Sequence, residues 1–270
     1  MNKPIGIMDS GVGGLTVMKE IIHALPGETV YYFADSFNCP YGPKSHEDVK
    51  RYTTEAVNFL IDKGVKAVII ACNTATAAVM PALRDAVDVP VYGVINPGSL
   101  GALRKSDNNE MLLLATEGTI KSGAYEEGIL SLDPDVNIHN LACPEFVTLI
   151  ENLDYKDPDI TRDCVYKKLE PYKNTEADTV ILGCTHFPII EQYIDEFFNG
   201  EKHIIDAGFE AVSTALVQLH KKKLLTAKND TPKHRVFIHG KNDNFEKIMN
   251  SWIPDLEYSI ENIYLQERIS

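Results

Sequence analysis

The sequence predicts an α/β fold made of two similar doubly wound α/β domains, with mainly parallel sheets and the active site in the cleft between them. Short apolar runs alternate with amphipathic segments along the 270 residues, which is typical of parallel strands joined by crossover helices. One phrase also occurs twice, as VIIACNTA at 68–75 and as VILGCTHF at 180–187. This internal echo indicates two domains of one plan. We expect the first to comprise residues 1–97 plus 208–270 and the second to comprise 98–207.

The predicted strands are apolar runs rich in β-branched or aromatic residues. In chain order they lie at 4–9, 29–35, 66–71, 90–95, 111–116, 136–142, 178–183, 203–208 and 234–240. The clearest helix between them spans 45–64, where Ser45 can cap the amino end and Gly64 ends the element. Its apolar stripe consists of Val49, Tyr52, Ala56, Phe59 and Leu60. This spacing predicts one buried helix face.

The composition narrows the class of protein. A formal net charge of −13 argues against a surface for nucleic acid or for an anionic membrane, so neither is expected as a partner. No stretch approaches the roughly 18 consecutive apolar residues that a membrane span needs. The amino-terminal MNKPIGIMDS also lacks the apolar core of a secretion signal. The expected location is therefore the cytoplasm.

The chain has five cysteines, and they form no CxxC pair. An odd number without such pairs argues against a disulfide framework and a structural zinc site, so free thiols are expected. Cys39 and Cys164 lack a polar strand-end context and are interpreted as buried apolar residues, whereas Cys143 stays open. Cys72 and Cys184 differ because each follows a predicted strand where a helix begins. Backbone N–H groups at such a place favour the thiolate form.

Polar residues collect where the predicted strands end, which is where doubly wound sheets bind ligands. They are Asp9 and Ser10, Asp35 and Ser36, Cys72 to Thr74, Thr116 and Glu117, Cys143, and Cys184 to His186. Asn73, Thr74 and Thr185 add hydrogen-bond donors beside the two thiols. This set suits a bound carboxylate or another small anion.

Two thiols that face each other indicate inversion at a carbon atom. One group must remove an acidic proton from one face of the carbon, and another must return a proton to the opposite face. A thiolate and a thiol on opposite walls of a cleft supply that pair. Asp9 and His186 are candidate helpers that tune the thiols. Asp9 would also suit a turn in DSGVGG, and His186 would also suit a hydrogen bond to a loop.

Other functions remain open on these residues. A cysteine-dependent hydrolase or lyase would need only Cys184 and His186, and an inactive amino-acid-binding module would use the same donors. Zinc held by Cys72, Cys184 and His186 would lack a further ligand nearby. We therefore expect no metal.

A dinucleotide site is a further alternative. Gly11, Gly13 and Gly14 follow a predicted strand, and Asp35 ends the next one, where a ribose-binding carboxylate would lie. Position 16, however, is Thr where the fingerprint has its third glycine, and Asp9 would place a carboxylate beside the pyrophosphate. These two features argue against nicotinamide binding.

A set of longer motifs covers nearly the whole chain. They are GIMDSGVGGLTV, YYFADS, PYGPKS, ACNTATA, GVINPG, LLLATEGTIKSGAY, CPEFVTLIE and LGCTHFP. With these motifs in this order, the chain resembles the cofactor-independent glutamate racemases of the aspartate/glutamate racemase superfamily. The resemblance implies interconversion of L- and D-glutamate without pyridoxal phosphate, any other cofactor or a metal, and supply of D-glutamate for peptidoglycan. It also suggests a homodimer. Aspartate racemase is the nearest rival, because one methylene of pocket depth separates the two substrates.

The resemblance also implies roles for single residues. Cys72 would take the α-proton from D-glutamate, and Cys184 would take it from L-glutamate. Asp9 would assist Cys72, while His186 and Glu151 would assist Cys184. The substrate would be held by Asp9, Ser10, Pro40, Tyr41, Gly42, Asn73, Thr74, Thr119, Thr185 and His186.

The chain departs from the family pattern at three positions, Thr148, Ala207 and His239. The family usually has Pro, Ser and a Thr-Ser-Gly-like turn there, respectively. These departures leave both thiols intact and bear on the local geometry around them.

Overall fold

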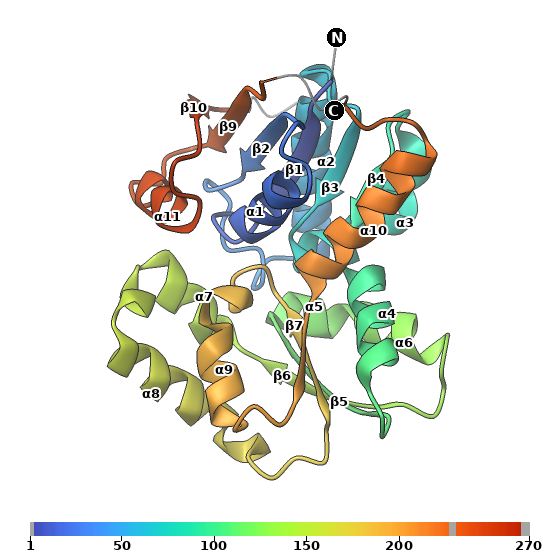
Figure 1. Ribbon diagram of the computed structural model, residues 1–270, viewed down its shortest axis with the longest axis vertical. Coiled ribbons are helices and arrows are strands. Elements are labelled where there is room, and N and C mark those ends of the chain that lie inside the picture. Colours follow the sequence, from blue (N-terminus) through green and yellow to red (C-terminus); the bar gives the residue numbers. More distant parts are fainter. Residues whose placement is uncertain (1–2, 227–230, 266–270) are drawn as a thin grey trace.

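Figure 1 shows the computed structural model of the protein, which describes residues 3–226 and 231–265. The chain forms two sheets, one above the other in this view. The upper sheet has six strands in the order β10-β9-β2-β1-β3-β4, and the lower has four in the order β6-β5-β7-β8. All their strand pairs are parallel. The predicted α/β fold with two mainly parallel sheets is therefore confirmed.

The elements of the upper sheet come from both ends of the described chain. They are β1 (Ile5–Asp9), α1 (Leu15–Ala24), β2 (Val30–Ala34), α2 (His46–Asp62), β3 (Ala67–Ile70), α3 (Asn73–Ala86), β4 (Val91–Gly93), β9 (His234–His239), α11 (Phe245–Trp252) and β10 (Tyr258–Ile263). Helices α2 and α3 pack on one face of this sheet, and α1 and α11 pack on the other together with α10 (Ala207–Lys221).

The elements of the lower sheet are continuous in sequence. They are α4 (Ile95–Lys105), β5 (Glu110–Ala115), α5 (Glu117–Ser122), α6 (Ala124–Leu130), β6 (Asn137–Ala142), α7 (Pro144–Glu151), α8 (Pro158–Leu169), β7 (Thr179–Gly183), α9 (Glu191–Phe197) and β8 (His203–Asp206). Short 3₁₀ turns lie at Asp154–Lys156, Glu170–Tyr172 and Phe187–Ile190. Helices α7, α8 and α9 cover one face, and α4, α6 and the start of α10 cover the other.

The two sheets repeat one topology. In the upper sheet the first four strands of the chain lie in the order second, first, third, fourth, and the lower sheet has the same order. Cys72 follows the third strand of the upper sheet, and Cys184 follows the third strand of the lower sheet. The repeated phrase in the sequence thus marks equivalent places. The domain limits at 97 and 207 remain a prediction, since α10 contributes Ala211 to the lower core and Leu219 to the upper one.

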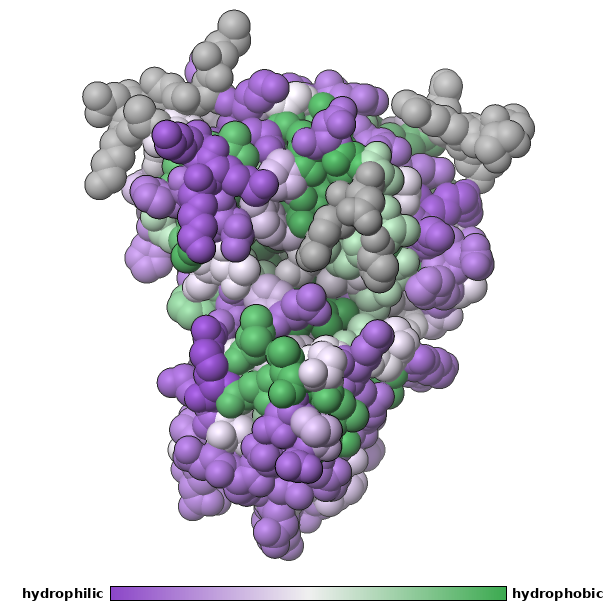
Figure 2. Space-filling model, turned by 90° about the vertical axis from the view of Figure 1, so that its right-hand side faces the viewer, coloured by the Kyte–Doolittle hydropathy of each residue, from purple (hydrophilic) through white to green (hydrophobic). Residues whose placement is uncertain are grey.

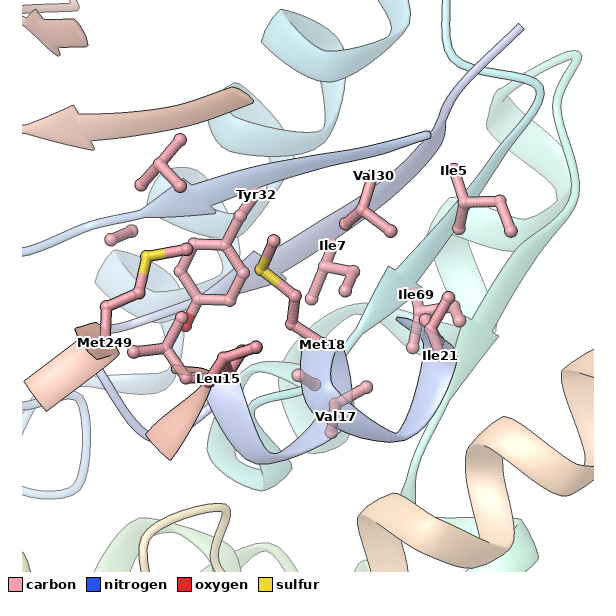
Figure 3. Packing of buried hydrophobic residues seen from close by; sticks show 14 of the residues in the cluster. Ile5, Ile7, Leu15, Val17, Met18, Ile21, Val30, Tyr32, Ile69 and Met249 are labelled. Atoms are coloured by element: carbon pink, nitrogen blue, oxygen red, sulfur yellow. The ribbon is translucent and has the colours of Figure 1, made fainter. Parts of the chain in front are cut away.

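Figure 3 shows how the upper core packs between β1, β2 and α1. Ile7 and Tyr32 lie against Met18 of α1, while Met8, the next residue of β1, faces the opposite core beneath α2 and α3. Alternate side chains of a strand point to opposite faces. The whole of β1 is therefore apolar up to its last residue, Asp9, because both faces are covered. Each large apolar side chain buried in this way contributes about 1.5–3 kcal/mol.

The predicted helix at 45–64 is confirmed, and its ends have the expected causes. The Ser45 side chain accepts a hydrogen bond from the N–H of Asp48, and Gly64 lies in the left-handed region at a φ of 82°. The fourth predicted strand is shorter than expected. β4 ends at Gly93, and α4 begins at Ile95, so the apolar run at 90–95 is divided between two elements.

Strand β10 at the edge of the upper sheet was not predicted. Its sequence YSIENI has three half-buried and three exposed residues, and too few of them are apolar to indicate a strand. In the described part of the chain, no helix combines the length and the apolar character that crossing a membrane requires.

Candidate active site

A pocket of about 270 Å³ lies between the two sheets. Its lining contains ten of the predicted site residues: Ser10, Pro40, Tyr41, Gly42, Cys72, Asn73, Thr74, Cys184, Thr185 and His186. Both thiols therefore face one cavity. Cys72 comes from the upper half, which is the six-stranded sheet with its helices, and Cys184 comes from the lower half, which is the four-stranded sheet with its helices. The other three predicted residues, Asp9, Thr119 and Glu151, do not line the pocket, and they hydrogen-bond to residues that do.

Cys72 lies at the amino end of α3 and is 6% exposed. Burial raises the pKa of its thiol to about 12, and the negative charge of Asp9 adds to this effect. Hydrogen bonds from the N–H of Ala75 and the hydroxyl of Ser10 oppose it and so favour a charged sulfur. A thiol with a pKa raised this far holds its proton at neutral pH.

Asp9 joins the two halves behind the pocket wall. It is fully buried, and one carboxylate oxygen accepts the N–H of Gly11 at 2.9 Å. The other accepts the hydroxyl of Thr185 at 3.2 Å, which comes from the lower half. Burial raises the pKa of the Asp9 carboxyl above its ordinary value, although the charge of His186 and these hydrogen bonds oppose the shift.

Cys184 has an imidazole as its partner. The Nδ1 atom of His186 lies 3.7 Å from the Cys184 sulfur, and the Nε2 atom lies 2.9 Å from Oε1 of Glu151. Burial would lower the pKa of His186, but the hydrogen bonds and negative charge of Cys184 and Glu151 raise it well above its usual value. Burial likewise would raise the pKa of Glu151, and the bond and charge of His186 instead lower it. The result is a charged His–Glu pair beside the second thiol.

The glycines of the GVGG loop permit close approach of the lower half. A Cβ atom on Gly13 would clash with the Thr185 hydroxyl and lie 2.6 Å from Nδ1 of His186. One on Gly11 would lie 2.6 Å from Oε1 of Glu151. The loop is therefore occupied by protein where a dinucleotide site would hold the pyrophosphate, which argues further against the nicotinamide alternative.

Three threonine hydroxyls form a cluster across the boundary between the halves. The Oγ1 atom of Thr74 lies 2.8 Å from that of Thr116 and 3.2 Å from that of Thr119, and the last two are 3.0 Å apart. Thr74 and Thr116 line the pocket. Hydroxyl protons rotate freely, so this cluster can direct donors toward a carboxylate.

Tyr41 is held in the pocket wall by a buried carboxylate. Its hydroxyl donates to Asp35, which also contacts the Nδ1 atom of His239 at 2.8 Å. His239, one of the three departures from the family pattern, thus has a definite partner. Ala207, the second departure, begins α10 and is fully buried.

The lining also contains Cys39, Pro43, Pro144, Val147 and Thr148, which were not predicted as site residues, and Thr116 and Glu117, which were expected only as polar residues at a strand end. Cys39 was expected to be a buried apolar residue, and this was wrong. It is half-buried at the pocket, with its sulfur 3.9 Å from Oε1 of Glu151. Thr148, the third departure, is also in the wall. One sequence signal could have indicated the lining residues of α7. Pro144 begins this helix only one residue after the end of β6, so the helix starts at a strand end, where ligands bind.

Comparisons with known proteins agree with this architecture. The family model described as Asp/Glu/hydantoin racemase matches residues 5–215. A glutamate racemase of Staphylococcus epidermidis is 43% identical over 267 residues, covering 99% of this chain and 100% of the relative.

Solved structures are similar over nearly their full length. A glutamate racemase isoform from Bacillus anthracis has a TM-score of 0.91 at 38% identity and covers 97% of this chain and 98% of its own. The glutamate racemase of Francisella tularensis, solved with D-glutamate, has a TM-score of 0.89 at 31% identity and covers 97% of both chains.

Proposed function

This chain belongs to the Asp/Glu/hydantoin racemase family, and from that premise we propose that it is a glutamate racemase that interconverts L- and D-glutamate by a two-thiol mechanism. One observation carries the proposal. Cys72 and Cys184 follow equivalent strands of two sheets and line one pocket from opposite halves. The relatives described above are glutamate racemases that match over nearly the full length, and one of them was solved with D-glutamate.

These two thiols account for both protons that move in the reaction, the one removed from the α-carbon and the one returned to it. In one direction the Cys72 thiolate takes the α-proton of D-glutamate, and the Cys184 thiol gives its proton to the opposite face of the carbanion. The product is L-glutamate, and the two sulfurs have exchanged protonation states. The reverse reaction uses the same groups in opposite roles. Neither direction consumes a reactant besides glutamate.

The helper residues have different tasks. Asp9, buried behind Cys72, has a carboxyl with a raised pKa and so can share or hold a proton near that sulfur. His186 is kept charged by Glu151 and attracts a negatively charged Cys184. Each thiol can then carry either charge state during the cycle.

The main difficulty is that an α-proton is far less acidic than a thiol, so the carbanion must be stabilised. The available donors are the amino end of α3 and the hydroxyl cluster of Thr74, Thr116 and Thr119. The hydroxyls of Ser10 and Thr185 already donate to Cys72 and Asp9. Hydrogen-bond donors already in place around the carboxylates of the substrate stabilise developing charge without reorganisation. Their position in a mostly buried pocket strengthens each interaction.

The proposal is tested by incubating the protein with D-glutamate in heavy water without added cofactor. Loss of the α-proton is followed by NMR and loss of optical rotation by polarimetry, with D-aspartate run in parallel. Rotation that decays to zero while deuterium enters the α-position supports the proposal. Exchange of aspartate alone indicates an aspartate racemase. If neither amino acid exchanges, the two-thiol proposal fails and the hydrolase and binding-module hypotheses take its place.

The cellular setting is also part of the proposal. We propose that the product D-glutamate supplies peptidoglycan synthesis, that the enzyme works in the cytoplasm and that it forms a homodimer, as the resemblance to its family implies. Depletion of the protein should then cause loss of cell shape that added D-glutamate reverses. Light scattering after size-exclusion chromatography measures the oligomeric state.

A further inference from the structure

Tyr125 carries a buried polar group that the proposed chemistry does not use. It lies in α6 within the motif SGAY, on the side of the lower sheet, and is 1% exposed. Its hydroxyl donates a hydrogen bond of 2.7 Å to Oδ1 of Asn73, which belongs to the upper half. Within residues 3–226 and 231–265 this is the only hydrogen bond of that hydroxyl. Tyr125 thus connects the lower half to the residue next to Cys72.

Asn73 presents the other end of its amide to the pocket. It is the first residue of α3, it lines the cavity, and it is only 3% exposed. Its Nδ2 group makes no hydrogen bond to any residue that the structure describes. An amide whose N–H donors have no protein partner at a pocket wall is free to donate to a ligand that enters the pocket. The adjacent amino end of α3 favours an anionic one.

We propose that Tyr125 is a positioning residue for racemisation, whose hydroxyl fixes the amide of Asn73 so that its N–H donors face a carboxylate of the substrate. The inference rests on the proposed function. Without Tyr125, the amide of Asn73 could rotate by half a turn and exchange its oxygen and nitrogen. Oδ1 would then face the carboxylate and repel it.

Three features keep the amide in the productive orientation. Burial, together with the negative charges of Asp206 and Cys184, raises the pKa of Tyr125, so the hydroxyl keeps its proton and donates it. Rotation of the Asn73 amide would leave that proton without an acceptor, which is costly for a buried group. The hydroxyl itself lies close to the backbone of α4, because a Cβ atom added to Gly98 would be 3.2 Å from the Tyr125 oxygen.

The first test replaces Tyr125 by phenylalanine, which keeps the ring and removes the hydroxyl. Circular dichroism would follow kcat and KM in both directions. We expect KM for glutamate to rise about fivefold, as for loss of one hydrogen bond, with kcat changed by less than about twofold. The matched control is Tyr172→Phe, whose hydroxyl donates to the backbone oxygen of Asn140 in β6, and neither residue lines the pocket. KM should not change in the control.

The second test distinguishes positioning from a general loss of structure. Tyr125→Phe is made in the background of Asn73→Ala, where no amide remains to be positioned. We expect KM to change by less than about twofold on this background, since coupled residues are not additive. An equal rise of KM in both backgrounds, or no rise in the native background, overturns the proposal.

A third variant covers the case in which Tyr125→Phe folds poorly. Asn73→Asp keeps the acceptor for Tyr125 and replaces the N–H donors by an anionic oxygen. We expect its melting temperature to stay near that of the native chain and its KM to rise further than in Asn73→Ala. Unchanged KM in Asn73→Asp overturns the proposal. If the native chain itself does not racemise glutamate, the proposed function fails, and positioning is then judged by calorimetry of D-glutamate binding, where Tyr125→Phe should weaken affinity about fivefold.

Discussion

The two thiols occupy equivalent places in the two halves of the molecule, but their surroundings have opposite charge. Cys72 follows β3, begins α3 directly and has the carboxylate of Asp9 behind it. Cys184 follows β7 and precedes only a 3₁₀ turn, Phe187–Ile190, rather than a full α-helix. Its neighbour is the imidazole of His186.

This difference shows what a repeated backbone plan provides and what it leaves open. The plan brings both sulfurs to the carboxyl ends of their strands, so they reach one pocket. The charge beside Cys72 comes from another element, since Asp9 ends β1. The charge beside Cys184 is that of His186, two residues further along the chain, and it is maintained by Glu151 of α7. A reaction that needs one thiol and one thiolate at the same time is served by such an asymmetric pair.

Replacing either thiol should have the largest effect. Cys72→Ser and Cys184→Ser should each lower kcat/KM by about 10²–10⁴-fold, because each removes one of two proton-transfer groups. Circular dichroism with both enantiomers gives the rates. Cys164→Ser, on α8 outside the pocket lining, is the control and should retain native rates. Near-native activity in Cys72→Ser would contradict the two-thiol mechanism and favour a Cys184–His186 hydrolase or lyase.

Replacing a helper residue should slow one of the two proton-transfer steps more than the other. Asp9→Asn and His186→Asn should each lower kcat/KM about 10- to 100-fold, which is part of the contribution expected for acid–base groups. The total effect must be equal in both directions because the equilibrium constant of racemisation is one. Primary deuterium isotope effects, measured with α-deuterated substrates, reveal which step has slowed.

With His186→Asn, the Cys184 step becomes limiting. The isotope effect should therefore rise for L-glutamate and fall for D-glutamate. Asp9→Asn should give the opposite pattern. If both variants change the two isotope effects alike, the division of helpers between the thiols is wrong.

The GVGG loop packs closely against Thr185 and His186, and the methyl group of an alanine at position 13 would disturb this contact. Gly13→Ala would push against Thr185 and His186, so we expect a loss of about 1–3 kcal/mol in free energy of unfolding and a marked fall in kcat. Urea unfolding and circular dichroism measure the two effects.

Gly64→Ala is the matched control for the loss of stability. It lies at a φ of 82° with open space around it, so it should lose about 1–2 kcal/mol with kcat unchanged. If Gly13→Ala keeps native kcat, the approach of the two halves is not needed for catalysis.

The smallest effect should appear in the pH dependence of stability. The folded-state pKa of His186 lies above its unfolded value of about 6.5. Its stabilising contribution is therefore fully present below that pH and is lost as pH rises through the raised folded-state pKa. Glu151 behaves oppositely, because its folded-state pKa is lowered. Its contribution is present above the unfolded value and is lost as pH falls through the lowered one.

The measurement compares urea unfolding of the native chain and His186→Asn at about pH 6 and about pH 9. The stability advantage of the native chain should shrink at the higher pH, by about 1.4 kcal/mol for each unit of raised pKa that is crossed. A constant difference between the two proteins would show that His186 does not titrate with a raised pKa.

Much of the fold could be predicted because its signals are local. The apolar runs of buried strands and the Ser45 cap of α2 depend on residues a few positions apart. Strand β10 was missed because an edge strand with one exposed face needs few apolar residues. Cys39 was misjudged because its contact, Glu151, lies 112 residues away.

The sequence by itself determined the alternation of strands and helices, the repeat that places Cys72 and Cys184 at equivalent strand ends, and the type of chemistry that two such thiols permit. Only the tertiary structure decided the contacts that these charged groups make with the thiols and with one another. The bonds from Thr185 to Asp9 and from Tyr125 to Asn73 join residues that are 176 and 52 positions apart. No periodicity or cap encodes such pairs. They form when two independently patterned sheets meet, because buried polar groups must then find their partners across the boundary.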